Sequence, residues 1–203
     1  HAPDHAAVRL NYASAIMRSN SPSPPTEADY DLAELQYARA LDAEDSPTMK
    51  FHTPGPRANR RALALRMLGN LRVLREDWSA AENFFESSWK QLPAAATWAA
   101  WAEVCFASGQ KDKLPHIIDE GLRHWPESWW PRAMRGLAAA TYSSRERFPL
   151  QAAEDLAAAE LAADATQPEL RSLQARALFT LAQIEAGRPR APQLIQRLEA
   201  LGT

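Results

Sequence analysis

The chain has 203 residues, of which 46% are hydrophobic and 24% charged, and its formal net charge at pH 7 is -2. A chain of this size and composition can bury one continuous core or a short stack of repeated units. The charge balance lacks the basic excess of proteins that neutralise many phosphates, which excludes nucleic acid as an expected partner. Alanine is common while valine and isoleucine are rare, so the composition predicts an all-α fold.

Neither a membrane span nor a disulfide is expected. No apolar run reaches the roughly 18 to 20 residues that a spanning helix needs, and Cys105 is the single cysteine. The richness in alanine and the preference for arginine over lysine are typical of a GC-rich bacterial coding sequence. We expect a bacterial protein of the cytoplasm or the periplasm. Because the chain begins at His1 rather than Met, we also expect that it has been processed or cut.

The N-terminal part predicts a pair of helices. Apolar residues recur at helical spacing in residues 4–18, which indicates the first helix. The serine- and proline-rich run 19–25 predicts a long turn. Thr26 and Asp29 then have the spacing of a capping box, which predicts the start of the second helix.

The next segment predicts an interruption. Asp42, Glu44 and Asp45 cluster before Pro47, and such a cluster at a helix end is typical of a solvated surface. Prolines and a glycine continue to residue 56, so we expect residues 47–56 to form a loop within one domain.

The centre of the chain contains a repeat. Pro93 and Pro126 lie about one repeat length, roughly 34 residues, apart. Aligning them brings a segment that begins at Ala62 into register with one that begins at Ala95. The first of these segments has the repeat pattern at Leu68, Gly69, Asn70, Trp78, Ala81 and Phe85.

Further units follow with poorer agreement. The second unit has an aromatic, a small residue and a turn glycine at Trp98, Ala102 and Gly109, and a third begins near Trp129, with Gly136 at the small position. In the third unit the second helix, with Leu156 and Ala159, fits only if the turn is about four residues longer. Gly69, Ala102 and Gly136 are expected where two helices meet closely, since a bulky side chain there would overpack the contact.

The C-terminal part predicts one more helix pair. Thr166 and Glu169 have capping-box spacing, and apolar residues at helical spacing continue from Leu173 to Ile184. A final helix is expected over residues 192–201, which gives about five helix pairs in all.

This pattern resembles the tetratricopeptide repeat family, most clearly over residues 62–126, with irregular repeats in 1–61 and 127–203. The resemblance implies that residues 1–203 form a single domain, a right-handed α-solenoid of about five helix-turn-helix repeats. In such a solenoid the first helices of the pairs line a concave groove that holds a segment of another protein. Carrying the groove-facing positions of the family onto this sequence gives Arg66, Asn70, Val73, Ala99, Glu103, Phe106, Trp130, Ala133 and Leu137.

Two details narrow the expected partner. Arg66 and Asn70 match half of the carboxylate clamp with which some relatives hold a chaperone tail. Ala96 and Ala100 stand where the other half needs polar and basic groups, which argues against that ligand. Trp130, beside Trp125 and Trp129, is either a contact for the partner or a wedge between adjacent repeats.

Residues for catalysis or metal binding do not assemble into a known pattern. His1, Asp4 and His5 lie at the terminus without a fourth ligand. His116 and His124 are two helical turns apart, and Cys105 occupies a core position of its helix. We therefore expect a protein-binding scaffold without metal, cofactor or catalytic activity, as part of a bacterial assembly, envelope or secretion complex. The alternative is a non-catalytic repeat domain of a larger enzyme, such as a glycosyltransferase or a polymerase.

Overall fold

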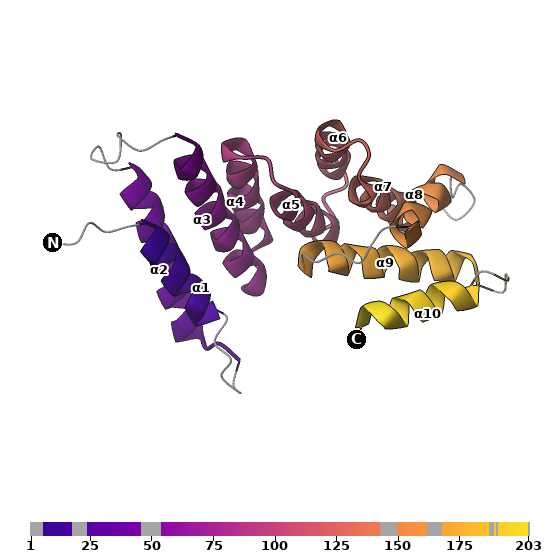
Figure 1. Ribbon diagram of the computed structural model, residues 1–203, viewed down its shortest axis with the longest axis horizontal. Helices are drawn as coiled ribbons and strands as arrows, with labels where there is room; N and C mark the ends of the chain where they lie inside the picture. The colour runs from indigo at the N-terminus through magenta and orange to yellow at the C-terminus, as the bar shows by residue number, and fades with distance from the viewer. Residues whose placement is uncertain are drawn as a thin grey trace. The chain divides into compact units, whose positions relative to one another are not determined.

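The computed structural model confirms the all-α prediction. It describes residues 6–17, 24–45, 54–142, 150–161, 168–186, 189 and 191–202. Within these ranges there are ten helices and no strand, and the helices pack in neighbouring pairs (Figure 1). None of the described helices is long and apolar enough to cross a membrane.

The chain divides into two compact units, residues 1–97 and 98–203, with the boundary inside helix α5 (Ala95–Ala107). The single domain expected from the repeat pattern therefore stays a prediction. The first unit contains four complete helices: α1 (Ala6–Met17), α2 (Glu27–Asp45), α3 (Pro54–Leu74) and α4 (Trp78–Gln91).

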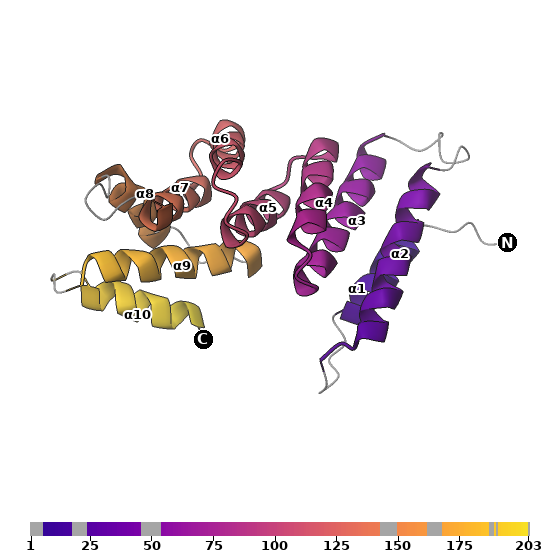
Figure 2. The ribbon, with the colours of Figure 1, turned by 180° about the vertical axis from the view of Figure 1, so that it is seen from behind.

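The helices of the first unit pack in chain order, α1 on α2, α2 on α3 and α3 on α4 (Figures 1 and 2). Their shared core includes Leu10, Tyr37, Leu68 and Leu71, each less than 5% exposed. These residues come from three different helices, so the apolar surface of each helix is buried by its neighbours in the sequence.

The start of α2 confirms the predicted capping box. The backbone amide of Thr26 donates to Oδ2 of Asp29 at 2.8 Å, and the backbone amide of Asp29 donates to the hydroxyl of Thr26 at 3.3 Å. The Thr26 hydroxyl also donates to Oδ2 of Asp29 at 2.7 Å, and this hydrogen bond, followed by the one from the Thr26 backbone amide, lowers the pKa of Asp29. The Thr26 amide, which the helix leaves without an acceptor, is thereby satisfied, and the Asp29 amide gains an acceptor in addition to the Thr26 carbonyl at 3.0 Å.

The start of α3 corrects the predicted loop. The helix begins at Pro54, whereas the loop was expected to reach residue 56; residues 46–53 lie outside the described part. Proline in the first turn is compatible with a helix, because the amide that it lacks would have no intrahelical acceptor there.

A glycine sets the distance between α3 and α4. A Cβ atom built on Gly69 would lie 2.6 Å from Cε1 of Phe85, which is closer than real Cβ atoms come to a neighbour. Phe85 is fully buried, so its ring lies directly against the backbone of α3. The prediction that Gly69 occupies a close helix contact is confirmed.

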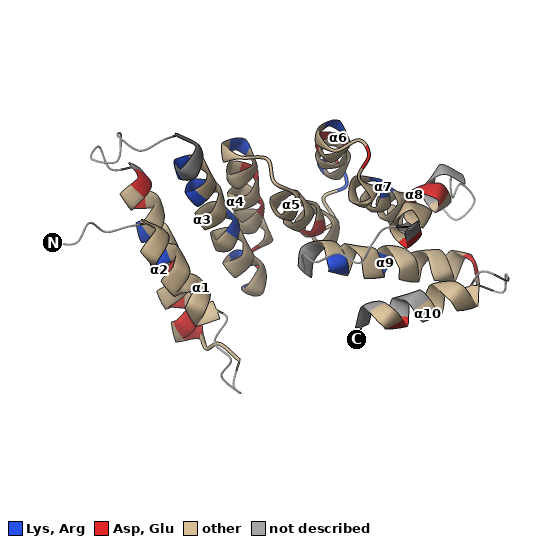
Figure 3. Cartoon of the chain, viewed as in Figure 1, with Lys and Arg blue, Asp and Glu red and all other residues tan. Residues whose placement is uncertain are grey.

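Ion pairs join α2 to α3 and to the turn after it. Acidic residues of α2 face arginines of α3, whose positions Figure 3 marks in blue. Arg72 pairs with Glu34, and Arg75 in the following turn contacts Glu27 at 2.7 Å and Asp31 at 2.6 Å. The hydrogen bond to Asp31, followed by the charges of Glu27 and Glu34, raises the pKa of Arg75 despite partial desolvation.

The expectation of a solvated acidic cluster at the end of α2 is wrong for Glu44. This side chain is 1% exposed and forms an ion pair with Arg60 of α3 through both carboxylate oxygens. A buried carboxylate is retained where a guanidinium can satisfy both oxygens. The sequence cluster gave no indication of this arginine, which comes from the next helix.

Replacing Arg75 with methionine is expected to lower the free energy of unfolding by about 0.5–1 kcal/mol at low salt, since its partners Asp31 and Glu27 are largely exposed. Most of this loss should disappear at about 1 M NaCl, where the Debye length is about 3 Å. Urea denaturation at both salt concentrations measures it. Lys90→Met, which removes one exposed pair with Glu86, is the control; equal losses from both variants at low salt would contradict the network.

The second unit contains the rest of α5 and five further helices: α6 (Leu114–His124), α7 (Trp129–Tyr142), α8 (Leu150–Leu161), α9 (Pro168–Ile184) and α10 (Ala191–Gly202). Here α7 packs on α6, α8 and α9, and α9 also packs on α8 and α10. The predicted boundaries at Pro93 and Pro126 are confirmed, since both prolines lie between helices. Thr166, and with it the second predicted capping box, lies outside the described residues.

The α5–α6 pair is built around a tryptophan. Trp98 is fully buried, and its indole nitrogen donates to the carbonyl of Ile117 at 2.7 Å. A Cβ atom on Gly121 of α6 would lie 2.5 Å from that same nitrogen. Ala102 and Gly136, the other predicted small positions, are buried as well. Small residues at close helix contacts are therefore a common feature of both units.

A buried carboxylate joins α7 to α8. Asp155 is 1% exposed and accepts two hydrogen bonds from Arg135, at 2.7 Å and 2.9 Å, with Arg132 nearby at 3.6 Å. The hydrogen bond to Asp155 raises the pKa of Arg135. The bidentate geometry fixes the orientation of the two helices.

Candidate functional site

The residues assigned to a groove by resemblance fall in both units. Arg66, Asn70 and Val73 lie on α3 in the first unit, where each side chain is partly buried. The other six lie on α5 and α7 in the second unit. A continuous groove through all nine residues therefore stays a prediction.

In the second unit, four of the predicted groove residues belong to the core. Ala99 and Ala133 are 0% exposed, Leu137 is 3% exposed and Trp130 is 6% exposed. Trp130 packs against Trp98 and Trp125, with ring centroids 4.7 Å apart in both pairs. Of the two interpretations of Trp130, the structure favours the wedge between helix pairs, because neighbouring aromatic rings already cover its surface.

Glu103, Phe106 and Leu137 come together with residues of α9. Arg176 of α9 forms an ion pair with Glu103, and its guanidinium lies over the ring of Phe106 at 4.7 Å. Leu137 and Phe106 line one cavity together with side chains of α9. Helix α9 therefore covers part of the surface of α5 and α7 that the resemblance assigns to a partner.

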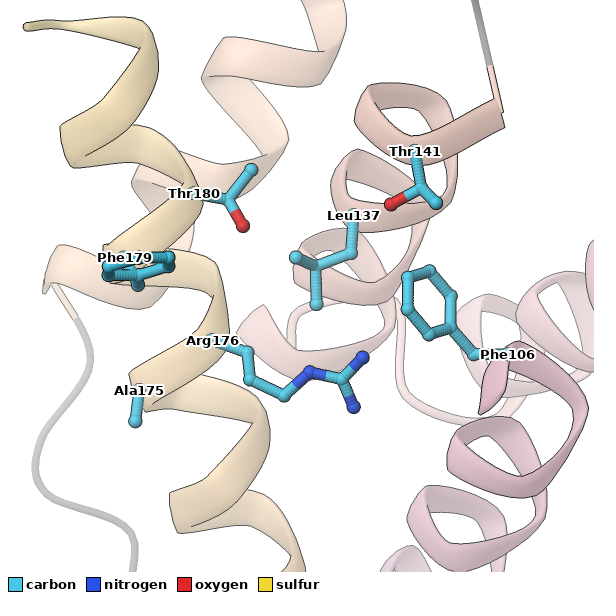
Figure 4. Close-up of a pocket in the computed structure, with 7 residues that line it drawn as sticks. All are labelled: Phe106, Leu137, Thr141, Ala175, Arg176, Phe179 and Thr180. Carbon is cyan, nitrogen blue, oxygen red and sulfur yellow. The ribbon is translucent and has the colours of Figure 1, made fainter. Parts of the chain in front are cut away.

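The cavity has walls from three helices, each the first helix of its pair. Phe106 comes from α5, Leu137 and Thr141 come from α7, and Figure 4 shows Arg176 of α9 reaching toward Phe106. Ala175, Phe179 and Thr180 complete the α9 wall. The volume is about 390 Å³, within the range of pockets that bind small molecules or side chains.

Phe106 and Phe179, which both line the cavity, differ in how closely neighbouring side chains pack around them. Tyr142 donates a hydrogen bond to the carbonyl of Phe106 at 2.8 Å and packs against its ring at 5.6 Å, while Lys111 lies over the Tyr142 ring. These contacts hold Phe106 from the side of α7. Phe179, in contrast, is 52% exposed although it lines the same cavity.

Glu103 has an unusual electrostatic environment for a carboxylate. Burial raises its pKa, and the opposing effect of the Arg176 charge and hydrogen bond is smaller. One oxygen contacts Arg176, whereas Oε1 is buried and has no hydrogen-bond partner among the described residues. Ionised Glu103 therefore lacks part of the stabilisation that water would give it.

The stability contribution of Glu103 should depend on pH. A carboxyl whose pKa is raised on folding contributes stability that is complete below its unfolded value, near 4.5, and is lost as the pH rises through the raised value. Glu103→Gln removes this titration. As the pH rises from about 4 to about 7, the wild type should lose this contribution and the variant should not. The difference in the free energy of unfolding should therefore shift in favour of the variant over this range, as measured by urea denaturation. A difference that is constant over this range would contradict the assignment.

The residues of α9 were not predicted as part of a site. The sequence correctly indicates the buried side of α9, where Leu173, Ala177 and Leu181 are fully buried. Arg176 and Phe179 do not belong to this row of buried residues. The signal that could have revealed them is Phe179 itself, an aromatic residue at a position outside the apolar spacing of the helix.

The other residues considered for catalysis or metal binding are mainly cysteine and histidine residues. Cys105 is fully buried, as expected for a core thiol, and His116 and His124 both lie on α6. The described residues contain no group of three or more His, Cys, Asp or Glu side chains that could hold a metal ion. His1, Asp4 and His5 lie outside the described ranges.

Comparison with known proteins adds no family to these observations: no family model, no curated protein and no solved structure matches the chain.

Proposed function

We propose that this protein is a helical-repeat scaffold of the tetratricopeptide type that binds a segment of another protein. The observation that carries the proposal is the cavity of about 390 Å³ among α5, α7 and α9, beside which Phe179 remains 52% exposed. An aromatic side chain at an open, mainly apolar hollow is a common feature of protein-binding surfaces.

The arrangement of the helix pairs supports a binding role. The three helices that form the cavity are the first helices of successive pairs, and in repeat scaffolds such helices form the recognition surface. Buried small residues and ion pairs between neighbouring helices hold this surface together, which favours recognition by a preformed site.

The test is a selection of random peptides displayed on phage against the whole chain, with an unrelated helical protein as the counter-selection. We expect enriched peptides that bind with dissociation constants in the micromolar range, about -8 kcal/mol. Fluorescence polarisation with the synthetic peptides then measures their affinity for the wild type and for variants.

Two variants locate the binding surface. Phe179→Ala should weaken the selected peptides about tenfold, equivalent to about 1.4 kcal/mol. Ile195→Ala is a matched control, because Ile195 is similarly exposed at 49% but lies on α10 and does not line the cavity. Failure to enrich any specific peptide would contradict the proposed function, and equal losses from both variants would contradict its location.

A further inference from the structure

The size and walls of the cavity suit a ring system. An apolar cavity of roughly 150 Å³ is large enough to bind benzene, so the cavity of about 390 Å³ among α5, α7 and α9 has room for a bicyclic aromatic group. Phe106 and Phe179 contribute rings from different helices, and Leu137 contributes an aliphatic side chain. Aromatic pairs in offset or edge-to-face geometry gain additional stability, which favours an aromatic occupant.

Among the apolar residues that line the cavity, Phe179 would bury the most additional surface when a ligand binds. Its side chain is 52% exposed, although Leu178 and Leu181 on the same helix are fully buried. A ring inserted into the cavity would remove exposed apolar surface of Phe179 from water, and this is the main favourable contribution to such binding.

Arg176 adds a positive charge with hydrogen-bonding capacity to the same wall. Nη1 contacts Glu103 and the guanidinium stacks on Phe106, but a guanidinium carries five N–H donors. Nε and Nη2 of Arg176 form no hydrogen bond with the residues that the structure describes. The side chain as a whole is 37% exposed and lines the cavity, so part of it is open to a ligand.

Glu103 does not remove this binding capacity. It occupies one nitrogen of Arg176 through Oε2, and its other oxygen is buried away from the solvent. Because burial raises the pKa of Glu103, the carboxylate is held in an environment that disfavours its charge. An arginine can bind a second carboxylate by donating hydrogen bonds from its remaining N–H groups, as planar guanidinium groups often do.

We propose that the cavity receives an aromatic side chain of the partner that stands next to a carboxylate, with the ring between Phe106 and Phe179 and the carboxylate on Nε and Nη2 of Arg176. This inference rests on the proposed function and specifies the chemistry of the segment that is recognised. An acidic residue beside a tryptophan or phenylalanine in the partner would satisfy both parts of the site.

Two small probes test the proposal directly: indole-3-propionate, which carries the ring and the carboxylate, and its neutral amide. Titrations of the whole chain are followed by two-dimensional NMR. We expect saturable shifts at Leu137, Thr141, Arg176 and Phe179, with the acid binding about tenfold more tightly than the amide because its hydrogen bonds to Arg176 are charge-assisted. Equal affinities, or shifts that map elsewhere, would overturn the proposal.

Variants separate the two halves of the site. Arg176→Gln should abolish the preference for the acid, whereas Glu103→Gln should increase it because a competing carboxylate is removed. Phe179→Ala should weaken both probes, and Ile195→Ala should leave both unchanged. An unaltered preference in Arg176→Gln would overturn the assignment of the carboxylate.

The outcomes also distinguish this inference from the proposed function. If the peptide selection succeeds but neither probe binds at the cavity, the chain is a peptide-binding scaffold and the cavity chemistry is wrong. If the probes bind as expected but no peptide is enriched, the site exists and the scaffold function is wrong.

Discussion

Replacing Trp98 with alanine is expected to lower the free energy of unfolding by about 3–5 kcal/mol, the usual range for deleting a large aromatic side chain from a core. Trp98 is fully buried, packs against Trp130 at 4.7 Å and donates its indole hydrogen to the carbonyl of Ile117. Urea denaturation followed by circular dichroism measures the change. Trp129→Ala is the matched control and should have a smaller effect, because Trp129 is only partly buried.

The contact between Trp98 and Gly121 predicts a change of sign. In the wild type, Gly121→Ala should be destabilising, since the new methyl group would overlap the indole ring, and overpacking costs about 1–3 kcal/mol. In the Trp98→Ala background the ring is gone, and the higher helix propensity of alanine, about 1 kcal/mol, should make the same change stabilising. If Gly121→Ala has the same effect in both backgrounds, the two residues are not in contact.

Replacing Phe85 with alanine is expected to have a similar effect in the first unit, a loss of about 3–5 kcal/mol. The ring of Phe85 is fully buried, and it fills the space that Gly69 leaves between α3 and α4. Phe84→Ala is the control, because Phe84 is the same residue type one position earlier and only partly buried. Thermal and urea denaturation should both rank Phe85→Ala as the more destabilising change.

Gly69→Ala tests the same contact from the other side. It should destabilise the wild type, because its Cβ atom would lie 2.6 Å from the Phe85 ring. Combined with Phe85→Leu, which replaces the flat ring with a smaller and more adaptable side chain, it should be much less harmful. An equal loss in both backgrounds would mean that another group opposes the added methyl.

The helices and their close contacts were predictable because local signals determine them. Pro93 and Pro126 end helices by removing backbone donors, and Thr26 with Asp29 caps α2 by a hydrogen bond three residues away. Gly69 was predictable because the repeat pattern has a small residue at this position. These are features of one segment or of a periodic pattern, so one sequence is enough to detect them.

Contacts between distant segments were less predictable. Glu44 looked solvated because its partner Arg60 belongs to the next helix, and Gly121 drew no attention although it receives the indole of Trp98. The position of a groove was carried over from an ideal repeat, in which the inner surface of each first helix is open. Helix α9 instead places Arg176 on Glu103 and Phe106, and no local signal specifies that placement.

The candidate site was therefore predicted only in part. Glu103, Phe106 and Leu137 do lie together, and two of them line the cavity. Trp130 was chosen because tryptophan is enriched at interfaces, yet packing against other tryptophans buries it. Phe179, in contrast, is exposed beside a cavity. How far an aromatic side chain is buried depends on tertiary packing rather than on residue type.

A double-mutant cycle between Glu103 and Arg176 tests the proposed site most directly, because the site requires α9 to lie against α5. Glu103→Gln, Arg176→Gln and the double variant are compared by urea denaturation at pH 7. We predict a favourable coupling free energy of at least about 0.5 kcal/mol, as for residues in direct contact. Strictly additive effects would show that the two side chains do not meet, and the cavity described among α5, α7 and α9 would then not exist in solution.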